Sequence, residues 1–214
     1  MKILVTGATG YIGGRIIPEL VALGHDVRVL VRDPRRIVGR PWVDDVEVAV
    51  GDVENPSTLP AALAGIDVAY YLIHLMDSGR DFVERDRQAA LNFAAAAEGV
   101  RRVIYLGGLL PDSKRISPHL ASRAEVGSIL RETLPTVEFR AGPVIGSGSA
   151  SFEMARYLTE RLPAMIAPRW ILNPVQPIAV DDVVAYLLAA VDRGTEGVYS
   201  VGSEPLTFKG MMQE

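Results

Sequence analysis

A glycine-rich segment near the N-terminus has the residue types and spacing of a phosphate-binding turn. Glycines stand at positions 7, 10 and 13, after the apolar run Ile3–Val5 and before an apolar-periodic segment. Glycine at these places lets the chain turn sharply, lets the backbone approach a phosphate, and lets a helix pack closely on a sheet. The N–H groups of that helix then face the anion. Alone, the pattern also fits an ordinary strand-to-helix turn. We expect a dinucleotide pyrophosphate here, contacted by Gly7, Thr9, Gly10, Tyr11, Ile12 and Gly13.

A charged cluster follows about twenty residues later, where such a unit meets the adenosine ribose. An acidic residue here would bind the 2′-hydroxyl and select NAD, whereas an arginine pairs with a 2′-phosphate and selects NADP. Arg32 stands at this place, followed by Arg35 and Arg36. The sequence therefore favours NADP, with NAD as the alternative. Two other interpretations stay open: the arginines form a solvated loop, or Asp33 turns inward as the ribose ligand.

Polar residues also end two further predicted strands. Asp52 and Val53 follow the third strand, where a polar group can hydrogen-bond adenine, although Asp52 also fits a turn or cap role. His74 follows the fourth strand. The carboxyl ends of parallel strands form the ligand side of a sheet, so His74 is expected near the nicotinamide, or is simply hydrogen-bonded.

Strands and helices alternate along most of the chain. Apolar runs predict the following strands: 3–5, 26–31, 46–50, 68–73, 103–106, 137–140, 178–180 and 198–201. Helical periodicity predicts helices over 11–23, 57–64, 79–99, 152–162 and 181–192, with another from Ser117. Gly24 is expected to end the first helix, and Ser117, Asp181 and Thr207 to cap later ones. This alternation predicts an α/β fold, a Rossmann-type doubly wound parallel sheet with helices on both faces and a small C-terminal substrate-side region.

Two helices carry polar residues that invite a functional interpretation. Asp86 interrupts the apolar stripe of the helix at 79–99, and the sequence alone assigns it no role. His119 and Arg123 lie four residues apart, on one face of the helix that begins at Ser117.

Composition excludes several classes of protein. Hydrophobic residues make up 49% and charged residues 22%, as in a globular chain. The net charge of −4 argues against a nucleic-acid partner. The absence of cysteine removes thiol chemistry and fits a cytoplasmic location. No apolar run is long enough to predict a membrane partner. The histidines at 25, 74 and 119 are scattered in sequence, so we expect no metal site.

The segment TGATGYIG at 6–13 resembles the cofactor turn of extended and atypical short-chain dehydrogenases/reductases. Later segments follow the order of that family: Leu30–Asp33, Gly51–Asp52, Arg140–Pro143 and Pro177–Val183. Within the superfamily the chain is most similar to the NmrA-like and nucleoside-diphosphate-sugar-epimerase-like branch, through 117–127 and 146–153. The resemblance covers nearly the whole chain. It implies a single NAD(P)-binding domain over 1–214, with a cofactor-binding core to about residue 142 and a substrate-side lobe over about 143–214. We expect that lobe to be truncated, since the last residues read as mid-helix. The long alanine-rich helix leaves a homodimer open.

The chain departs from the family at the catalytic positions. Active members use a Tyr-x-x-x-Lys pair and a serine or threonine at the end of the fifth strand, but none of the seven tyrosines has a lysine four residues on. His119 and Arg123 stand where the pair is expected, and Gly107–Gly108 where the hydroxyl residue would be. Histidine can protonate a developing alkoxide, and arginine can bind a ribose hydroxyl or a phosphate.

Two main hypotheses follow. The chain is an NADP-dependent reductase with His119 and Arg123 at its catalytic site, acting on a small-molecule substrate near His74 and the loop at 146–152. Alternatively, it is a non-catalytic NmrA-like module that binds the dinucleotide or senses redox state. A sugar-nucleotide epimerase is a third option, which the short segment after the sixth strand disfavours.

Overall fold

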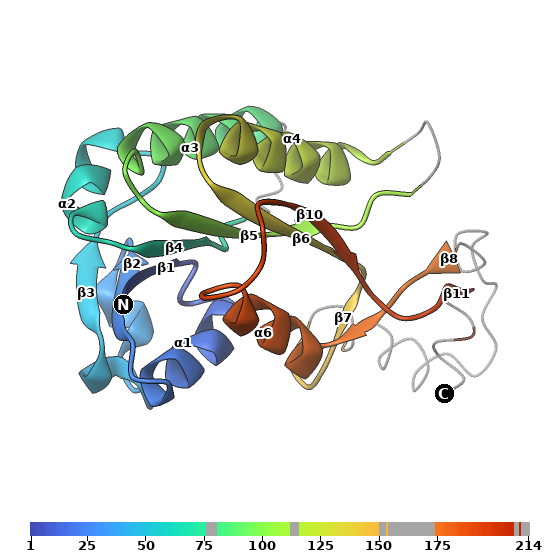
Figure 1. The fold of residues 1–214 in the computed structure, drawn as a ribbon, viewed down its shortest axis with the longest axis horizontal. Coiled ribbons are helices and arrows are strands. Elements are labelled where there is room, and N and C mark those ends of the chain that lie inside the picture. Colours follow the sequence, from blue (N-terminus) through green and yellow to red (C-terminus); the bar gives the residue numbers. More distant parts are fainter. Residues whose placement is uncertain (76–80, 112–115, 150–152, 154–173, 208–209, 211–214) are drawn as a thin grey trace.

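A parallel sheet lies at the centre of the molecule (Figure 1). The computed structural model describes residues 1–75, 81–111, 116–149, 153, 174–207 and 210. Within these residues the sheet has seven strands in the order β10-β6-β5-β4-β1-β2-β3, and every neighbouring pair is parallel. The strands are β1 (Lys2–Thr6), β2 (Asp26–Val31), β3 (Glu47–Val50), β4 (Val68–Tyr71), β5 (Arg102–Gly108), β6 (Thr136–Ala141) and β10 (Gly197–Val201). The predicted doubly wound α/β fold is confirmed.

Helices cover both faces of this sheet. On one face lie α2 (Leu59–Leu63), α3 (Phe82–Ala96) and α4 (Pro118–Thr133), and on the other lie α1 (Gly13–Ala22) and α6 (Val180–Ala189) (Figure 1). Single turns of 3-10 helix occur at η1 (Pro34–Ile37), η2 (Val43–Asp45) and η3 (Pro56–Thr58). Two small pairs complete the described elements: β7 (Val144–Ile145) with β9 (Ile178–Ala179), and β8 (Pro174–Val175) with β11 (Leu206–Thr207).

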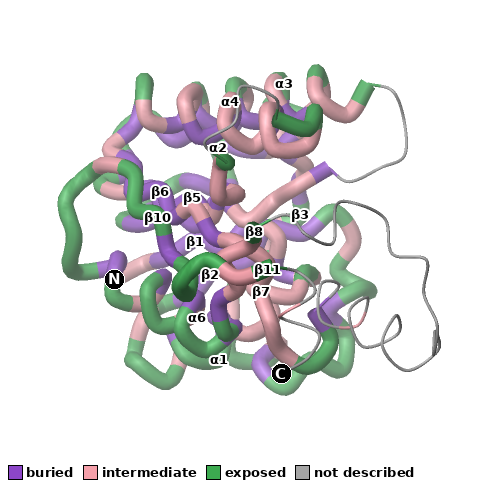
Figure 2. The backbone as a smooth tube through the Cα atoms, turned by 90° about the vertical axis from the view of Figure 1, so that its right-hand side faces the viewer, coloured by how far each residue is buried: buried purple, intermediate pink, exposed green. Residues whose placement is uncertain are grey.

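Each face of the sheet has its own apolar core. Side chains alternate along a strand, so Ile3 and Val5 pack with the α1 and α6 side, while Leu4 packs with the α2, α3 and α4 side. Both faces of the inner strands are therefore apolar, which explains their continuous hydrophobic runs. Figure 2 shows buried residues concentrated in the sheet and on the helix sides that face it.

The strand order places a switch point between β1 and β4. The chain runs from β1 outward to β2 and β3, then returns to the other side of β1 for β4, β5 and β6. In open parallel sheets of this kind, the crevice beyond the carboxyl ends at the switch point is where ligands bind.

Most element ends agree with the sequence predictions, and one cap does not. Gly24 follows α1 with φ of 80°, and the Ser117 hydroxyl accepts a hydrogen bond from the Leu120 N–H at the start of α4. Asp181 was the wrong cap: α6 starts one residue earlier, at Val180, and its N-cap residue is Ala179. Thr207 ends β11 opposite Pro174, and its Oγ1 accepts the Gly210 N–H at 3.0 Å, which is the bond expected of a helix cap.

Two further expectations fall partly outside the described residues. The helix predicted over 152–162 lies there except for residue 153, and so does the beginning of the helix predicted from residue 79. No helix within the described ranges is long and apolar enough to span a bilayer.

Candidate functional site

The glycine turn joins β1 to α1 through close backbone contacts. Gly7 has φ of 72°, and a Cβ there would lie 2.6 Å from the Leu72 carbonyl oxygen at the end of β4. A Cβ at Gly13 would lie 2.3 Å from the Gly7 carbonyl oxygen. The Gly10 N–H donates to that same oxygen at 2.9 Å. Backbone therefore packs on backbone throughout the turn, which only glycine permits.

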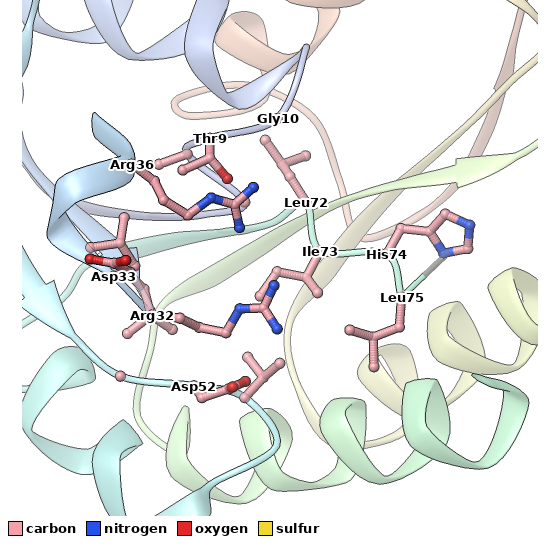
Figure 3. A pocket seen from close by; sticks show the side chains of 16 residues that line it. Thr9, Gly10, Arg32, Asp33, Arg36, Asp52, Leu72, Ile73, His74 and Leu75 are labelled. Carbon is pink, nitrogen blue, oxygen red and sulfur yellow. The ribbon is translucent and has the colours of Figure 1, made fainter. Parts of the chain in front are cut away.

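A cleft with a volume of about 200 Å³ opens beside this turn, at the carboxyl ends of β1, β2, β3 and β4 (Figure 3). Its lining comes from four segments: Gly7–Gly10, Leu30–Asp33 with Arg36, Gly51–Val53, and Leu72–Leu75. The cleft thus lies at the switch point that the strand order creates.

Most of the residues predicted to bind cofactor meet in this cleft. Those that line it are Gly7, Thr9, Gly10, Arg32, Asp52, Val53 and His74. Tyr11, Ile12 and Gly13 lie at the start of α1 and are not among the lining residues, and neither is Arg123 on α4.

The arginines after β2 take two different positions. Arg32 and Arg36 line the cleft, and Figure 3 shows both guanidinium groups pointing into the space between Thr9 and Asp52. Arg35 instead pairs with Asp33, whose carboxylate accepts from the Arg35 guanidinium and backbone N–H. These bonds lower the pKa of Asp33, chiefly through the Arg35 side chain. The mouth of the cleft beside β2 therefore presents two guanidinium groups and a carboxylate that is already paired.

Asp52 is both a turn residue and part of the lining. Its Oδ1 accepts the Glu54 N–H at 3.0 Å, and its own N–H donates to the Thr58 hydroxyl at 3.0 Å. The turn role that the sequence left open is therefore present, and the side chain still borders the cleft next to Arg32 (Figure 3).

At the end of the cleft formed by residues 72–75, two histidines meet. His74 Nε2 lies 3.1 Å from His119 Nδ1, and the two rings stand edge to face with centroids 4.4 Å apart. His74 lines the cleft, so its contact with His119 joins α4 to the cleft. The fold brings these two together, although they stand 45 positions apart.

Asp86 lies behind this pair and is 3% exposed. One carboxylate oxygen, Oδ2, lies 3.5 Å from His74 Nδ1 and accepts the Ser122 hydroxyl at 2.9 Å. The other, Oδ1, accepts the Leu75 N–H at 3.0 Å. The polar residue on the apolar stripe of α3 thus contacts His74, the member of the pair that lines the cleft. Its position in an apolar stripe was the available signal, but its partners could not be identified from sequence.

Burial and charge shift the protonation of this group. Burial alone would raise the pKa of Asp86, but the hydrogen bonds from His74, the Leu75 N–H and Ser122 together lower it. The pKa of His119 is lowered, first by burial and then by His74 and Arg123, with Asp86 acting in the opposite direction. Asp86 therefore remains a carboxylate at neutral pH, and His119 favours its neutral form.

Arg123 forms hydrogen bonds with residues of β5. Its guanidinium donates to the Leu106 carbonyl, while its own carbonyl accepts the Tyr105 hydroxyl. Its buried Nε has no hydrogen-bond partner among the described residues. Gly108 packs against this helix: a Cβ there would lie 2.7 Å from Leu120 Cδ2. Gly108 thus allows α4 to approach β5, whereas a Cβ at Gly107 would lie 3.1 Å from Glu138 Oε1 on β6, and neither glycine supplies a hydroxyl.

Tyr11 links the turn to the loop after β7. A Cβ at Gly146 would lie 2.6 Å from the Tyr11 hydroxyl oxygen, so this loop lies against the tyrosine. The Arg15 guanidinium stacks 3.8 Å from the Tyr11 ring centroid and donates to the Ser147 carbonyl at 2.8 Å. Sequence reasoning gave Arg15 no role, since its partner lies more than a hundred positions away.

Curated relatives include reductases and dehydrogenases. A ceramide reductase from Caulobacter vibrioides is 30% identical over 194 residues, which cover 87% of this chain and 60% of that protein. An NAD(P)H azoreductase from Xenophilus azovorans is 34% identical over 116 residues, covering 52% and 37%. A 3-beta-hydroxysteroid dehydrogenase from Mycolicibacterium neoaurum is 31% identical over 108 residues, covering 50% and 28%. The chain therefore spans less than two thirds of the length of these relatives.

Solved structures of similar fold include WbmG from Bordetella bronchiseptica in complex with NAD. It has a TM-score of 0.80 and 20% identity, covering 100% of this chain and 76% of that one. The UDP-glucose 4-epimerase of Thermus thermophilus, in complex with NAD, has a TM-score of 0.76 and 21% identity, covering 100% and 81%. At these identities the likeness establishes the fold.

The family is established by a match to a family profile over more than half of the chain. The profile of the NmrA-like family matches residues 1–145, which include the glycine turn, the whole cleft and the histidine pair. This chain belongs to the NmrA-like family.

Proposed function

We propose that this chain is an NAD(P)-dependent oxidoreductase that holds its dinucleotide in the cleft and uses His119 to exchange a proton with a carbonyl or hydroxyl substrate. The contact of His119 with the cleft-lining His74 is the observation that carries this proposal. Relatives that are themselves named reductases and dehydrogenases support the class of reaction.

The turn fits a pyrophosphate by its chemistry. At Gly7 and Gly13 a Cβ would collide with backbone, so the turn brings main-chain N–H groups, rather than side chains, to the cleft. The Gly14 and Arg15 N–H groups donate to the Gly10 and Ile12 carbonyls. The N–H groups of Tyr11, Ile12 and Gly13 have no hydrogen-bond partner among the described residues, so they are available to an anion. We assign the pyrophosphate to the turn and α1: Gly7, Thr9, Gly10, Tyr11, Ile12 and Gly13.

The other lining residues receive the remaining parts of the dinucleotide. Asp52 and Val53 border the adenine, and His74 lies toward the nicotinamide end. Arg32 and Arg36 favour NADP, because two guanidinium groups in the cleft can pair with a 2′-phosphate while Asp33 is engaged by Arg35. We assign Arg123, whose guanidinium lies at the end of β5 against the Leu106 carbonyl, to a ribose hydroxyl or a phosphate.

The chemistry divides between cofactor and protein. A bound nicotinamide supplies or accepts a hydride. Reduction of a carbonyl also requires one proton on the oxygen, and His119 is the titratable group placed to give it. His119 is half-buried on α4, next to the cleft but outside its lining, so a substrate can reach it without displacing the glycine turn. We place the substrate side in the lobe beyond about residue 142, where the loop at 146–149 contacts Tyr11.

A non-catalytic dinucleotide-binding or redox-sensing module is the second candidate. One observation favours it: the end of β5 carries Gly107–Gly108, and the neighbouring Arg123 guanidinium is tied to the Leu106 carbonyl. The side-chain hydroxyl that orients a carbonyl in related enzymes is therefore missing there.

Turnover separates the two candidates. NADPH oxidation is followed across aldehydes, ketones and enones, with His119→Ala beside a control, His25→Ala, whose residue precedes β2 at the opposite end of the sheet. We expect at least one substrate, a loss in kcat of roughly 10²–10⁴-fold for His119→Ala, and parental NADPH affinity in both variants. Full activity of His119→Ala would exclude His119 as the acid. Binding without any turnover would favour the sensor.

A further inference from the structure

We propose that Asp86 acts through His74 to fix the tautomer of His119, leaving His119 Nε2 as the nitrogen that takes and gives the substrate proton. Asp86 and His74 are then positioning residues. The catalytic meaning of this arrangement rests on the function proposed above, but the arrangement itself can be tested without cofactor or substrate.

The carboxylate determines which nitrogen of His74 carries the proton. Asp86 is ionised and has only acceptors, so the group that faces it must donate. Ser122 donates its hydroxyl to Oδ2 and Leu75 its N–H to Oδ1. His74 Nδ1, 3.5 Å from Oδ2, therefore carries its proton toward Asp86.

The same reasoning continues to His119. Neutral His74 with a proton on Nδ1 has a lone pair on Nε2, which can only accept. His119 Nδ1, 3.1 Å away, must then donate. Neutral His119 is left with its lone pair on Nε2, the nitrogen that does not face His74. The hydrogen bonds in this series all run in one direction: His119 donates to His74, and His74 donates to Asp86.

This polarity suits proton exchange in both directions. His119 Nε2 accepts a proton from a hydroxyl, or, once protonated, gives it to a developing alkoxide. After either transfer His119 keeps its proton on Nδ1 and still donates it to His74 Nε2. The hydrogen bonds of the two histidines therefore do not have to rearrange. In the reversed polarity, neutral His119 would carry its proton on Nε2 and could not accept another there.

Within the described part of the chain, three charged or titratable groups influence His119: His74 after β4, Asp86 on α3 and Arg123 on its own helix. Of these, Asp86 is the one that favours the protonated form. Removing its charge should therefore lower the pKa of His119 further, in addition to changing the tautomer.

The Asp86→Asn variant is expected to reverse the direction of the hydrogen bonds between residue 86, His74 and His119. The Leu75 N–H is a backbone donor at the carboxylate's Oδ1 position, so the amide oxygen of the variant should take that place. The amide NH₂ then faces Ser122 and His74 and donates to His74 Nδ1. His74 must carry its proton on Nε2, and His119 must accept on Nδ1.

Long-range ¹H–¹⁵N correlation spectra of ¹⁵N-histidine-labelled protein distinguish these tautomers. They are recorded without cofactor, at a pH of about 8 where histidine is neutral. In the parent we expect protons on Nδ1 of both His74 and His119, and in Asp86→Asn on Nε2 of both. His25 serves as an internal reference. Glu84→Gln is the matched control, since it removes the same charge from an exposed position on α3.

The parent spectrum decides the proposal even if Asp86→Asn fails to fold. Ser122→Ala supplies a second variant, which keeps the carboxylate and should keep both parental tautomers. A parent with the His119 proton on Nε2, or a folded Asp86→Asn protein with parental tautomers, would overturn the proposal. If the expected tautomers are observed but no substrate is turned over, the tautomer proposal is supported and only the proposed oxidoreductase function is contradicted.

Discussion

The Asp33 carboxylate and the Arg35 guanidinium form two parallel hydrogen bonds, Nε to Oδ1 and Nη2 to Oδ2, each 2.9 Å long. Asp33 Oδ1 also accepts the Arg35 backbone N–H at 3.0 Å, so the Asp33 carboxylate caps η1. Asp33, the acidic residue that would bind the 2′-hydroxyl of NAD, is thus already hydrogen-bonded to Arg35. Arg32 and Arg36 remain to face the cleft.

We therefore predict that NADPH binds more tightly than NADH and that Arg32→Ala and Arg36→Ala remove most of the difference. A charge-assisted hydrogen bond of this kind contributes about 1.5–3 kcal/mol, or roughly tenfold to a hundredfold in affinity. Arg101→Ala is the control, because it removes the same charge at the opposite end of the sheet, before β5. Titration calorimetry gives both affinities, and equal affinities in the parent would contradict the prediction.

Replacement of Arg35 tests the other half of this relationship. Arg35→Ala leaves Asp33 free to accept from a ribose hydroxyl. NADH should then bind at least as tightly as to the parent, while NADPH loses affinity through the unpaired carboxylate. The ratio of the two dissociation constants is the measurement. A variant in which both affinities fall equally would show that Arg35 itself contacts the dinucleotide.

The glycine turn predicts two distinct outcomes for similar substitutions. In Gly13→Ala, the new Cβ would lie 2.3 Å from the Gly7 carbonyl oxygen, so α1 must move away from the sheet. Overpacking of this kind costs about 1–3 kcal/mol of stability. In Gly10→Ala the same oxygen is 3.1 Å away, so the fold should change less while the methyl group obstructs the phosphate. Urea unfolding and NADPH titration of both variants separate the effects, and equal destabilisation would contradict this account.

The pH dependence of activity follows from the lowered pKa of His119. Burial, then His74 and Arg123, place it below the usual value of about 6.5. With His119 as the proposed acid, carbonyl reduction requires its protonated form, so kcat/KM for reduction should fall as pH rises through that lowered pKa. Oxidation of the alcohol needs the neutral form and should rise through the same pKa. Profiles measured in both directions check this, and a reduction rate that increases with pH would contradict it.

Local patterns were enough to predict the fold and most of the cleft. The glycines at 7, 10 and 13 act through their own backbone, and the polar residues at strand ends reach the cleft because parallel strands end at one edge. The cap assigned to Asp181 failed because helix ends depend on a residue or two of context. The cap assigned to Thr207 could be predicted, because its Oγ1 accepts the N–H of Gly210, only three residues further on.

The contacts between Asp86 and the histidines required three-dimensional information. Asp86 contacts Leu75, His74 and Ser122, which follow β4 or lie on α4 and have no fixed spacing from it. A sequence shows that such a residue interrupts an apolar stripe, but it does not show which groups form hydrogen bonds with the buried side chain. The same limit applies to Arg28, to which the sequence assigned no role. Its buried guanidinium donates to the Ala62 and Ala64 carbonyls at the end of α2.

A buried ion cluster of Glu138, Arg131 and Arg140 allows a prediction about the free energy of unfolding, independent of function. Glu138 on β6 is 1% exposed and pairs with Arg131 on α4 and with Arg140, whose Nε lies 2.7 Å from Oε1. Gly127 makes room for it, since a Cβ there would lie 2.5 Å from Glu138 Oε2. Glu138→Ala leaves two half-buried guanidinium groups without their carboxylate.

Loss of one partner from such a pair costs about 3–5 kcal/mol, because the remaining charge is desolvated and unpaired. Glu125→Ala is the matched control: its carboxylate pairs with Arg87 at 2.7 Å, but both side chains are about one third or more exposed. Surface pairs contribute about 0–1 kcal/mol. The free energy of unfolding in urea should therefore drop several times more for Glu138→Ala than for Glu125→Ala. Equal losses would mean that the cluster on β6 is as well hydrated as the pair on the surface.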